Sequence, residues 1–88
     1  MRVRFAQALQ RHVSCPEETV AGSTVGEALA AYFGVHARVA GYVLDERGTL
    51  RKHMSIFLDG RPVVDRVTLS DSLESIRTID VYQALPGG

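Results

Sequence analysis

The sequence contains little cysteine, no tryptophan and no long hydrophobic run. Cys15 is the one cysteine among 88 residues, so no disulfide can form within the chain, as is typical of a reducing compartment. No stretch approaches the ~20 apolar residues of a membrane span, and the first residues lack the apolar run of a signal peptide. Ten basic and ten acidic residues cancel, so no net charge attracts nucleic acid or a membrane. We expect a small cytoplasmic domain with neither as a partner.

Motifs of metal sites, nucleotide-binding proteins and enzymes are also missing. The three histidines, His12, His36 and His53, are scattered without paired spacing, so no metal site is expected. No glycine-rich phosphate-binding motif is present, so we expect the chain to bind neither ATP nor another cofactor by itself. Cys15 could carry a persulfide, but it has no CxxC partner, and we interpret it as a small packing residue. The chain is not expected to be an enzyme.

Alternating apolar and polar residues predict several short strands. Apolar residues alternate with arginines over residues 1–5, which indicates a first strand with one buried face. The pattern of residues 68–73 is typical of a single helical turn. Residues 35–44 are expected to form either a second, weaker helix or an irregular connection. The other expected strands are 19–21, 54–58, 62–64 and 79–82, with Asp59-Gly60 as a hairpin turn after the second of these.

One longer helix is predicted over residues 24–33. Thr24 and Glu27 match the capping box, in which the threonine hydroxyl accepts a backbone N–H and the glutamate reaches back to the cap's N–H. Gly34 is expected to end the helix in the left-handed conformation. The order of elements indicates an α+β domain in which this helix covers one face of a mixed sheet of four or five strands. The residues expected to be buried together are Leu29, Phe33, Ile56, Leu58 and Val81.

The sequence ends in Gly87-Gly88, and its pattern resembles a known family. Because the two glycines lack a Cβ, they can thread a narrow channel and present a carboxylate in a partner's active site. The order of motifs is similar to that of the ubiquitin-like, β-grasp sulfur carriers of the thiamine and molybdopterin pathways. Ala6 stands where many molybdopterin-type carriers have a second aromatic residue. The stretches that carry the resemblance are residues 3–5, 22–29, 56–60, 68–71 and 81–88.

The resemblance implies a function for the end of the chain. Residues 1–84 would form the β-grasp domain, and residues 85–88 a flexible tail that threads through Leu85, Pro86 and Gly87. A separate ATP-dependent enzyme would adenylate the Gly88 carboxylate, and a sulfur donor would convert it to a thiocarboxylate. A downstream synthase would then accept the sulfur for cofactor or metabolite biosynthesis.

Phe57 and Tyr82 are the expected centre of the partner-binding face, together with Ala84. If Ile56 and Val81 point toward the helix, strand alternation puts Phe57 and Tyr82 on the opposite face. Two exposed aromatic residues on one face favour docking of a partner protein. The alternative is that residues 35–50 fold over this face and bury both side chains.

Two other functions remain open at this point. In the first, the chain is a ubiquitin-like protein modifier, and Gly88 forms an isopeptide bond with a lysine of a target protein. Activation would be the same, and only the attacking nucleophile would differ. In the second, the chain is a non-catalytic interaction module whose tail is inert.

Overall fold

The computed structural model describes residues 1–83 of the chain, so Ala84, Leu85, Pro86, Gly87 and Gly88 lie outside the described residues. Within this range the chain forms five strands and three helices. The strands are β1 (Arg2–Phe5), β2 (Glu18–Thr19), β3 (Met54–Leu58), β4 (Arg61–Pro62) and β5 (Thr78–Gln83). The helices are α1 (Gln7–Gln10), α2 (Val25–Val35) and α3 (Ala37–Val43).

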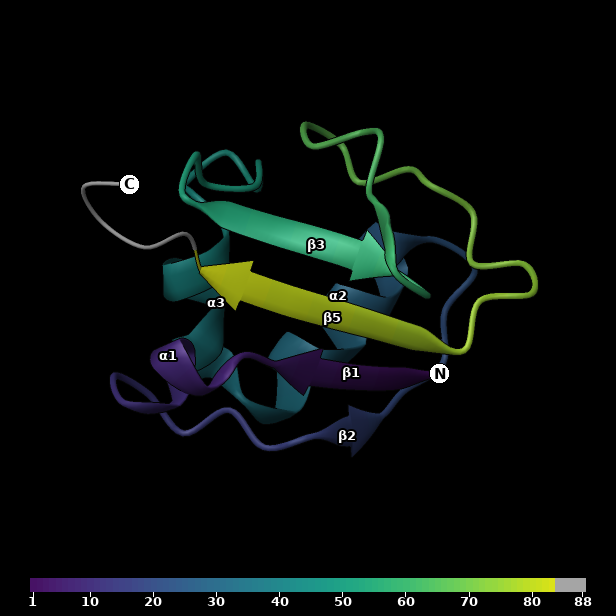
Figure 1. Cartoon of the computed structure of the whole chain (residues 1–88). Helices are drawn as coiled ribbons and strands as arrows, with labels where there is room; N and C mark the ends of the chain where they lie inside the picture. Colours follow the sequence, from purple (N-terminus) through teal and green to yellow (C-terminus); the bar gives the residue numbers. More distant parts are fainter. Residues whose placement is uncertain (84–88) are drawn as a thin grey trace.

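The strands form one mixed sheet in the order β2-β1-β5-β3-β4. β1 and β5 are parallel at its centre, and the other neighbours are antiparallel. Helices α2 and α3 lie on one side of this sheet, and α1 lies at the end of the sheet where β1 finishes (Figure 1). The other side of the sheet faces the viewer uncovered. The expected α+β architecture and β-grasp order are confirmed. Two short strands lie slightly earlier than expected: β2 was expected at residues 19–21 and β4 at residues 62–64.

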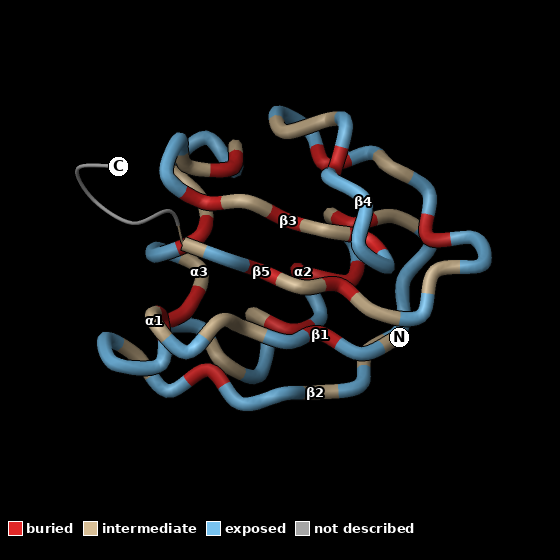
Figure 2. Tube along the Cα trace, viewed as in Figure 1, coloured by how far each residue is buried: buried red, intermediate tan, exposed pale blue. Residues whose placement is uncertain are grey.

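The hydrophobic core lies between the sheet and the helices (Figure 2). Of the five residues expected there, only Phe33 is not buried. The buried residues of α2 follow a spacing of three and four that runs through Leu29 and Tyr32, so Tyr32 takes the central place and Phe33 lies beside it. The Tyr32 hydroxyl donates to the Pro16 carbonyl at 2.7 Å, which satisfies its polar group inside the core.

The start of α2 is capped nearly as predicted, but its end differs. Thr24 Oγ1 accepts from the Glu27 N–H at 3.2 Å, while Glu27 Oε1 accepts from the N–H of Ser23 rather than that of Thr24. The expected stop at Gly34 is wrong, because α2 continues to Val35. The chain changes direction at His36, whose φ of −121° is not helical, and then forms α3. The helical alternative for residues 35–44 is therefore the one observed.

The turn after β3 has the predicted form. Asp59 and Gly60 have φ values of 48° and 87°, as in a two-residue hairpin turn of type I′, and Leu58 pairs with Arg61 across it. The Asp59 carboxylate also accepts hydrogen bonds from the N–H groups of Arg77 and Thr78. This turn and the start of β5 are thereby tied together.

The helical turn expected at residues 68–73 is not formed. The Asp65 carboxylate instead accepts hydrogen bonds from the backbone and the hydroxyls of Ser70 and Thr68, and Leu69 has a φ of 55°. These hydrogen bonds, from Ser70 first and then Thr68, lower the pKa of Asp65 below its ordinary value. The Leu69 carbonyl accepts from the Gly26 N–H at 2.9 Å, which docks this loop on the first turn of α2.

Candidate functional site

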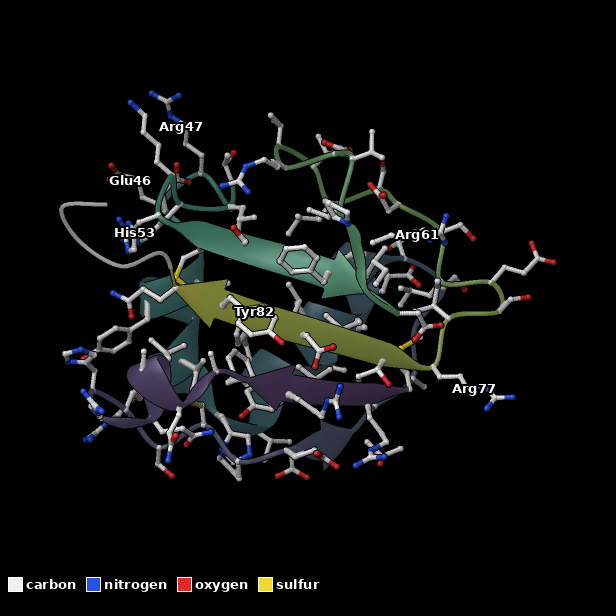
Figure 3. All side chains as sticks on the ribbon, viewed as in Figure 1. Glu46, Arg47, His53, Arg61, Arg77 and Tyr82 are labelled. Carbon is white, nitrogen blue, oxygen red and sulfur yellow. The ribbon has the colours of Figure 1, made fainter. Side chains whose placement is uncertain are left out.

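Two aromatic side chains meet on the open face of the sheet. Phe57 of β3 and Tyr82 of β5 have ring centroids 5.5 Å apart and rings inclined at 83°, an edge-to-face arrangement. They are diagonal neighbours, because Tyr82 is paired with Ser55 and Phe57 with Asp80. Figure 3 shows Tyr82 on the face turned away from the helices. The predicted face of both residues is therefore confirmed.

The aromatic pair is accessible from solvent. Tyr82 keeps 47% of its surface exposed, and Phe57 is half-buried. Residues 35–50 do not cover them, since Val39 and Val43 of α3 are buried in the core on the other side of the sheet. A partly exposed Phe–Tyr pair on a strand surface is typical of the centre of a protein-protein interface.

A shallow hollow adjoins the pair. Phe57, Gly60, Asp80 and Tyr82 line a space of about 420 Å³ that opens to solvent. The hollow has the size to accept one or two apolar side chains of a partner.

An ion pair borders the aromatic residues on the side of β1. Arg4 donates to both carboxylate oxygens of Asp80, at 2.7 and 3.1 Å. The hydrogen bond and charge of Asp80 raise the pKa of Arg4 above its usual value. Exposed ion pairs contribute little to stability but add orientation to a docking surface. An apolar centre with a charged rim is the usual anatomy of such a surface.

A second hollow lies next to this ion pair. It measures about 310 Å³ and is lined by Arg4, Ala6, Asp80 and Tyr82, among others. Ala6 contributes only a methyl group to the lining of this hollow.

The remaining predicted site residues follow directly after β5. Leu85, Pro86, Gly87, Gly88 and Ala84 lie outside the described residues, so their predicted roles stay predictions. The last described residue, Gln83, is paired with Met54 at the beginning of β3.

The other reactive side chains do not form a second centre in the described part of the chain. Cys15 is completely buried, and burial raises the pKa of its thiol, which suits a packing residue rather than a nucleophile. His36 Nε2 lies 2.7 Å from Glu18 Oε2, and His12 stacks on Tyr42. Over residues 1–83 no group of three His, Cys, Asp or Glu side chains is placed to hold a metal ion. No helix in that range is long and apolar enough to cross a membrane.

Sequence reasoning missed one concave surface on the helical side. The loop after α1, the end of α2 and the start of α3 enclose an open groove of about 630 Å³. Two separate segments, residues 12–14 and 35–42, form this groove, so no local motif could have indicated it. Its polar and apolar lining includes His12, His36, Arg38, Val35 and Tyr42.

No protein-family model matches the sequence, and no curated protein matches it. Among the solved structures with a similar fold are three that match over nearly the whole chain. SAMP1 from Haloferax volcanii has a TM-score of 0.76 at 21% identity and covers 99% of this chain and 97% of its own. Small archaeal modifier protein 1 of H. volcanii has a TM-score of 0.67 at 18% identity, and the match covers 96% of this chain and 95% of that protein. A chain of the Amycolatopsis orientalis BexX/CysO complex has a TM-score of 0.75 at 18% identity, and the match covers 99% of this chain and 98% of the chain in the complex.

These matches establish the class of fold. The chain has the ubiquitin-like β-grasp fold, as the resemblance drawn from its sequence implied. The identities are low, so the likeness concerns the fold and not the activity.

Proposed function

We propose that this chain is a ubiquitin-like sulfur carrier, adenylated at Gly88 by a separate ATP-dependent enzyme and then converted to a thiocarboxylate. One observation carries the proposal: the exposed Tyr82 lies on β5, the strand that leads into Leu85-Pro86-Gly87-Gly88. A partner that docks on the open face of β5 therefore holds the chain within a few residues of the glycines. Docking and presentation of the carboxylate would be one event.

The chemistry explains why activation is needed. A carboxylate is a poor electrophile, because its leaving group would be oxide. Transfer of AMP to the Gly88 carboxylate gives an acyl-adenylate and releases pyrophosphate. Sulfide then attacks the carbonyl carbon and displaces AMP. The resulting thiocarboxylate is a soft nucleophile that a downstream synthase can use.

Under this proposal the chain supplies only the carbonyl carbon of Gly88, and partner proteins supply the catalytic groups, the ATP site and the sulfur donor. ATP would be bound by the adenylating enzyme, and the chain itself would hold no cofactor and act in the cytoplasm. The matched structures support a carrier or modifier of this kind, since they include SAMP1 and a complex of CysO, a sulfur carrier, with BexX.

The test uses the 88-residue chain, its adenylating enzyme, ATP and sulfide. We expect the chain to gain the mass difference between sulfur and oxygen, localised to its C-terminal peptide. Deleting Gly88, or adding one residue after it, should abolish the gain. Failure to form either an adenylate or a thiocarboxylate with the cognate enzyme would overturn the proposal.

A protein modifier is the second candidate function. It is favoured by the likeness to two structures of SAMP1, a small archaeal modifier protein. In that case the amine of a target lysine, rather than sulfide, would displace AMP. Isopeptide-linked forms of the chain on other proteins, without a detectable thiocarboxylate, would replace the carrier proposal with this one.

A further inference from the structure

The groove on the helical side plays no part in the proposed function. Its base is apolar, because Val39 is fully buried and Val13 packs against the core. Val35 and Tyr42 also line it, with 70% and 42% of their surfaces exposed, and they are two of the five large apolar side chains that residues 1–83 expose. No residue that lines this groove lines either hollow on the open sheet face, so the groove is a separate surface.

The two segments that form the groove are held in place by the chain itself. The His12 N–H donates to the carbonyl of the buried Leu9 at 3.0 Å, which fixes the loop after α1. The His12 ring stacks on Tyr42 of α3, with centroids 6.5 Å apart and rings inclined at 21°. In the other segment, the Val39 N–H donates to the His36 carbonyl at 3.1 Å. The groove therefore exists before a ligand binds, and little ordering of the loop opposes binding.

The sequence around the groove contains positive but no negative side chains. Residues 1–16 and 28–44 contain no aspartate or glutamate, although the whole chain has ten acidic residues. Arg38 lines the groove, and Arg11 directly precedes the lining residue His12. Both arginines are exposed, and within residues 1–83 neither belongs to an ion pair. A chain without net charge thus concentrates positive charge at this groove.

One carboxylate does approach the groove, from β2. Glu18 Oε2 lies 2.7 Å from His36 Nε2, so any positive charge on His36 is matched within the chain. The Glu18 side chain is not among those that line the groove. The charge of Arg11 and Arg38 is left for a ligand, and a guanidinium keeps that charge at any working pH. The surface is therefore complementary to carboxylates.

We propose that this groove binds a short acidic segment of a partner protein, in which one large apolar side chain is flanked by aspartate or glutamate. The apolar side chain packs on Val13, Val35 and Val39, and the carboxylates pair with Arg11 and Arg38. An apolar centre inside a charged rim is the anatomy of a protein interface. A small-molecule site instead needs enclosed polar groups, and among residues 1–83 no polar or charged residue is buried.

The groove gives the chain a second docking surface. It lies among α2, α3 and the loop after α1, whereas Phe57 and Tyr82 lie on the uncovered side of the sheet (Figure 1). A protein held at the groove therefore leaves the aromatic pair accessible to another partner. The inference does not depend on activation of Gly88, so its failure would leave the carrier proposal intact.

The test uses the 15N-labelled 88-residue chain and three blocked ten-residue peptides. The first has a central Leu-Phe pair flanked by aspartates and glutamates. The second has Asn and Gln in place of the acids, and the third has Ser and Gly in place of the central pair. We expect the first to bind with a Kd below about 1 mM and to shift the resonances of residues 12–14 and 35–42. The two control peptides should bind about fivefold more weakly or less, and added salt should weaken the first.

Matched variants separate the local charge from the net charge of the chain. Arg38→Gln should weaken binding of the acidic peptide by about fivefold, the upper range for an exposed ion pair, and Arg38→Lys should largely restore it. Arg77→Gln removes the same charge at the end of the sheet where β5 begins (Figure 3) and should leave the Kd unchanged. Val35→Ser should also cost about fivefold in Kd through lost apolar contact.

Three results would overturn the inference. Equal affinity for the acidic and the neutral peptide would show that the arginines do not select the ligand. An equal effect of Arg38→Gln and Arg77→Gln would show that only the net charge of the chain matters. Shift changes confined to residues 55–57 and 80–82, or the absence of a saturable shift, would show that the groove is not the binding surface.

Discussion

Removal of the aromatic pair on the open sheet face should weaken binding of the partner enzyme much more than it lowers the unfolding free energy of the chain. In Phe57→Ala and Tyr82→Ala, each substitution breaks the edge-to-face contact at 5.5 Å, and such contacts are worth about 0.5–1.5 kcal/mol. Neither residue is fully buried, so little of the core is lost. Each variant should therefore lose about 1 kcal/mol of unfolding free energy. Leu29→Ala, which leaves a cavity in the core, should lose about 2–5 kcal/mol.

The effect on binding should be much larger than the effect on stability. Aromatic residues at the centre of an interface commonly cost about 2 kcal/mol or more when truncated, which is roughly thirtyfold in Kd. We expect this loss for each of the two variants when they are titrated calorimetrically with the adenylating enzyme. Urea denaturation of the same samples gives the unfolding free energy. The double variant gives the coupling between the two rings.

A matched control comes from another exposed apolar side chain. Val64 is 88% exposed in the loop after β4, so Val64→Ala should change neither Kd nor stability. The docking argument would be refuted if the Phe57 and Tyr82 variants bound the enzyme normally. A loss of stability as large as that of Leu29→Ala would show that the two rings are structural.

Four further predictions concern the fold. A Cβ at Gly22 would lie 2.7 Å from the backbone nitrogen of Ala28, so Gly22→Ala should destabilise by about 1–3 kcal/mol in urea denaturation. A Cβ at Gly34 of α2 would meet no other atom within 4 Å, so Gly34→Ala should instead raise the unfolding free energy by about 0.5–1 kcal/mol. Thr24→Ala removes the cap of α2 and should cost about 1 kcal/mol in the same assay. The hydrogen bonds of Asp65 lower its pKa in the folded protein. Ionised Asp65 therefore stabilises the fold fully above the ordinary carboxyl pKa, and this stabilisation is lost as the pH falls through the lower pKa of the folded state. Asp65→Asn should flatten the acid side of a plot of unfolding free energy against pH.

The parts of the fold that were predictable from sequence depend on local signals. Thr24 and Glu27 mark the start of α2 because a capping box needs only four consecutive residues. Asp59-Gly60 marks the hairpin because both residues accept a positive φ. The face on which Phe57 and Tyr82 lie also followed from strand alternation alone.

The parts that could not be predicted depend on contacts distant in sequence. Whether Tyr32 or Phe33 faces the core is decided by the position of α2 against the sheet, and by the Pro16 carbonyl that accepts the Tyr32 hydroxyl. Residues 68–73 have a helix-like pattern, but Asp65 takes up the N–H groups and hydroxyls of that loop, and this arrangement replaces the helical turn. The helix α1 has only four residues, too few to show a periodicity.

The position of β5 connects the fold to the proposed function. β5 is hydrogen-bonded to β1 on one side and to β3 on the other, so it is a central strand rather than an edge. A central strand opens only when the sheet around it opens, whereas an edge strand can detach locally. Tyr82 and Gln83 are therefore fixed relative to the whole domain. A partner that binds the open face of β5 would gain a rigid reference point from which the glycines that follow could be directed into its active site.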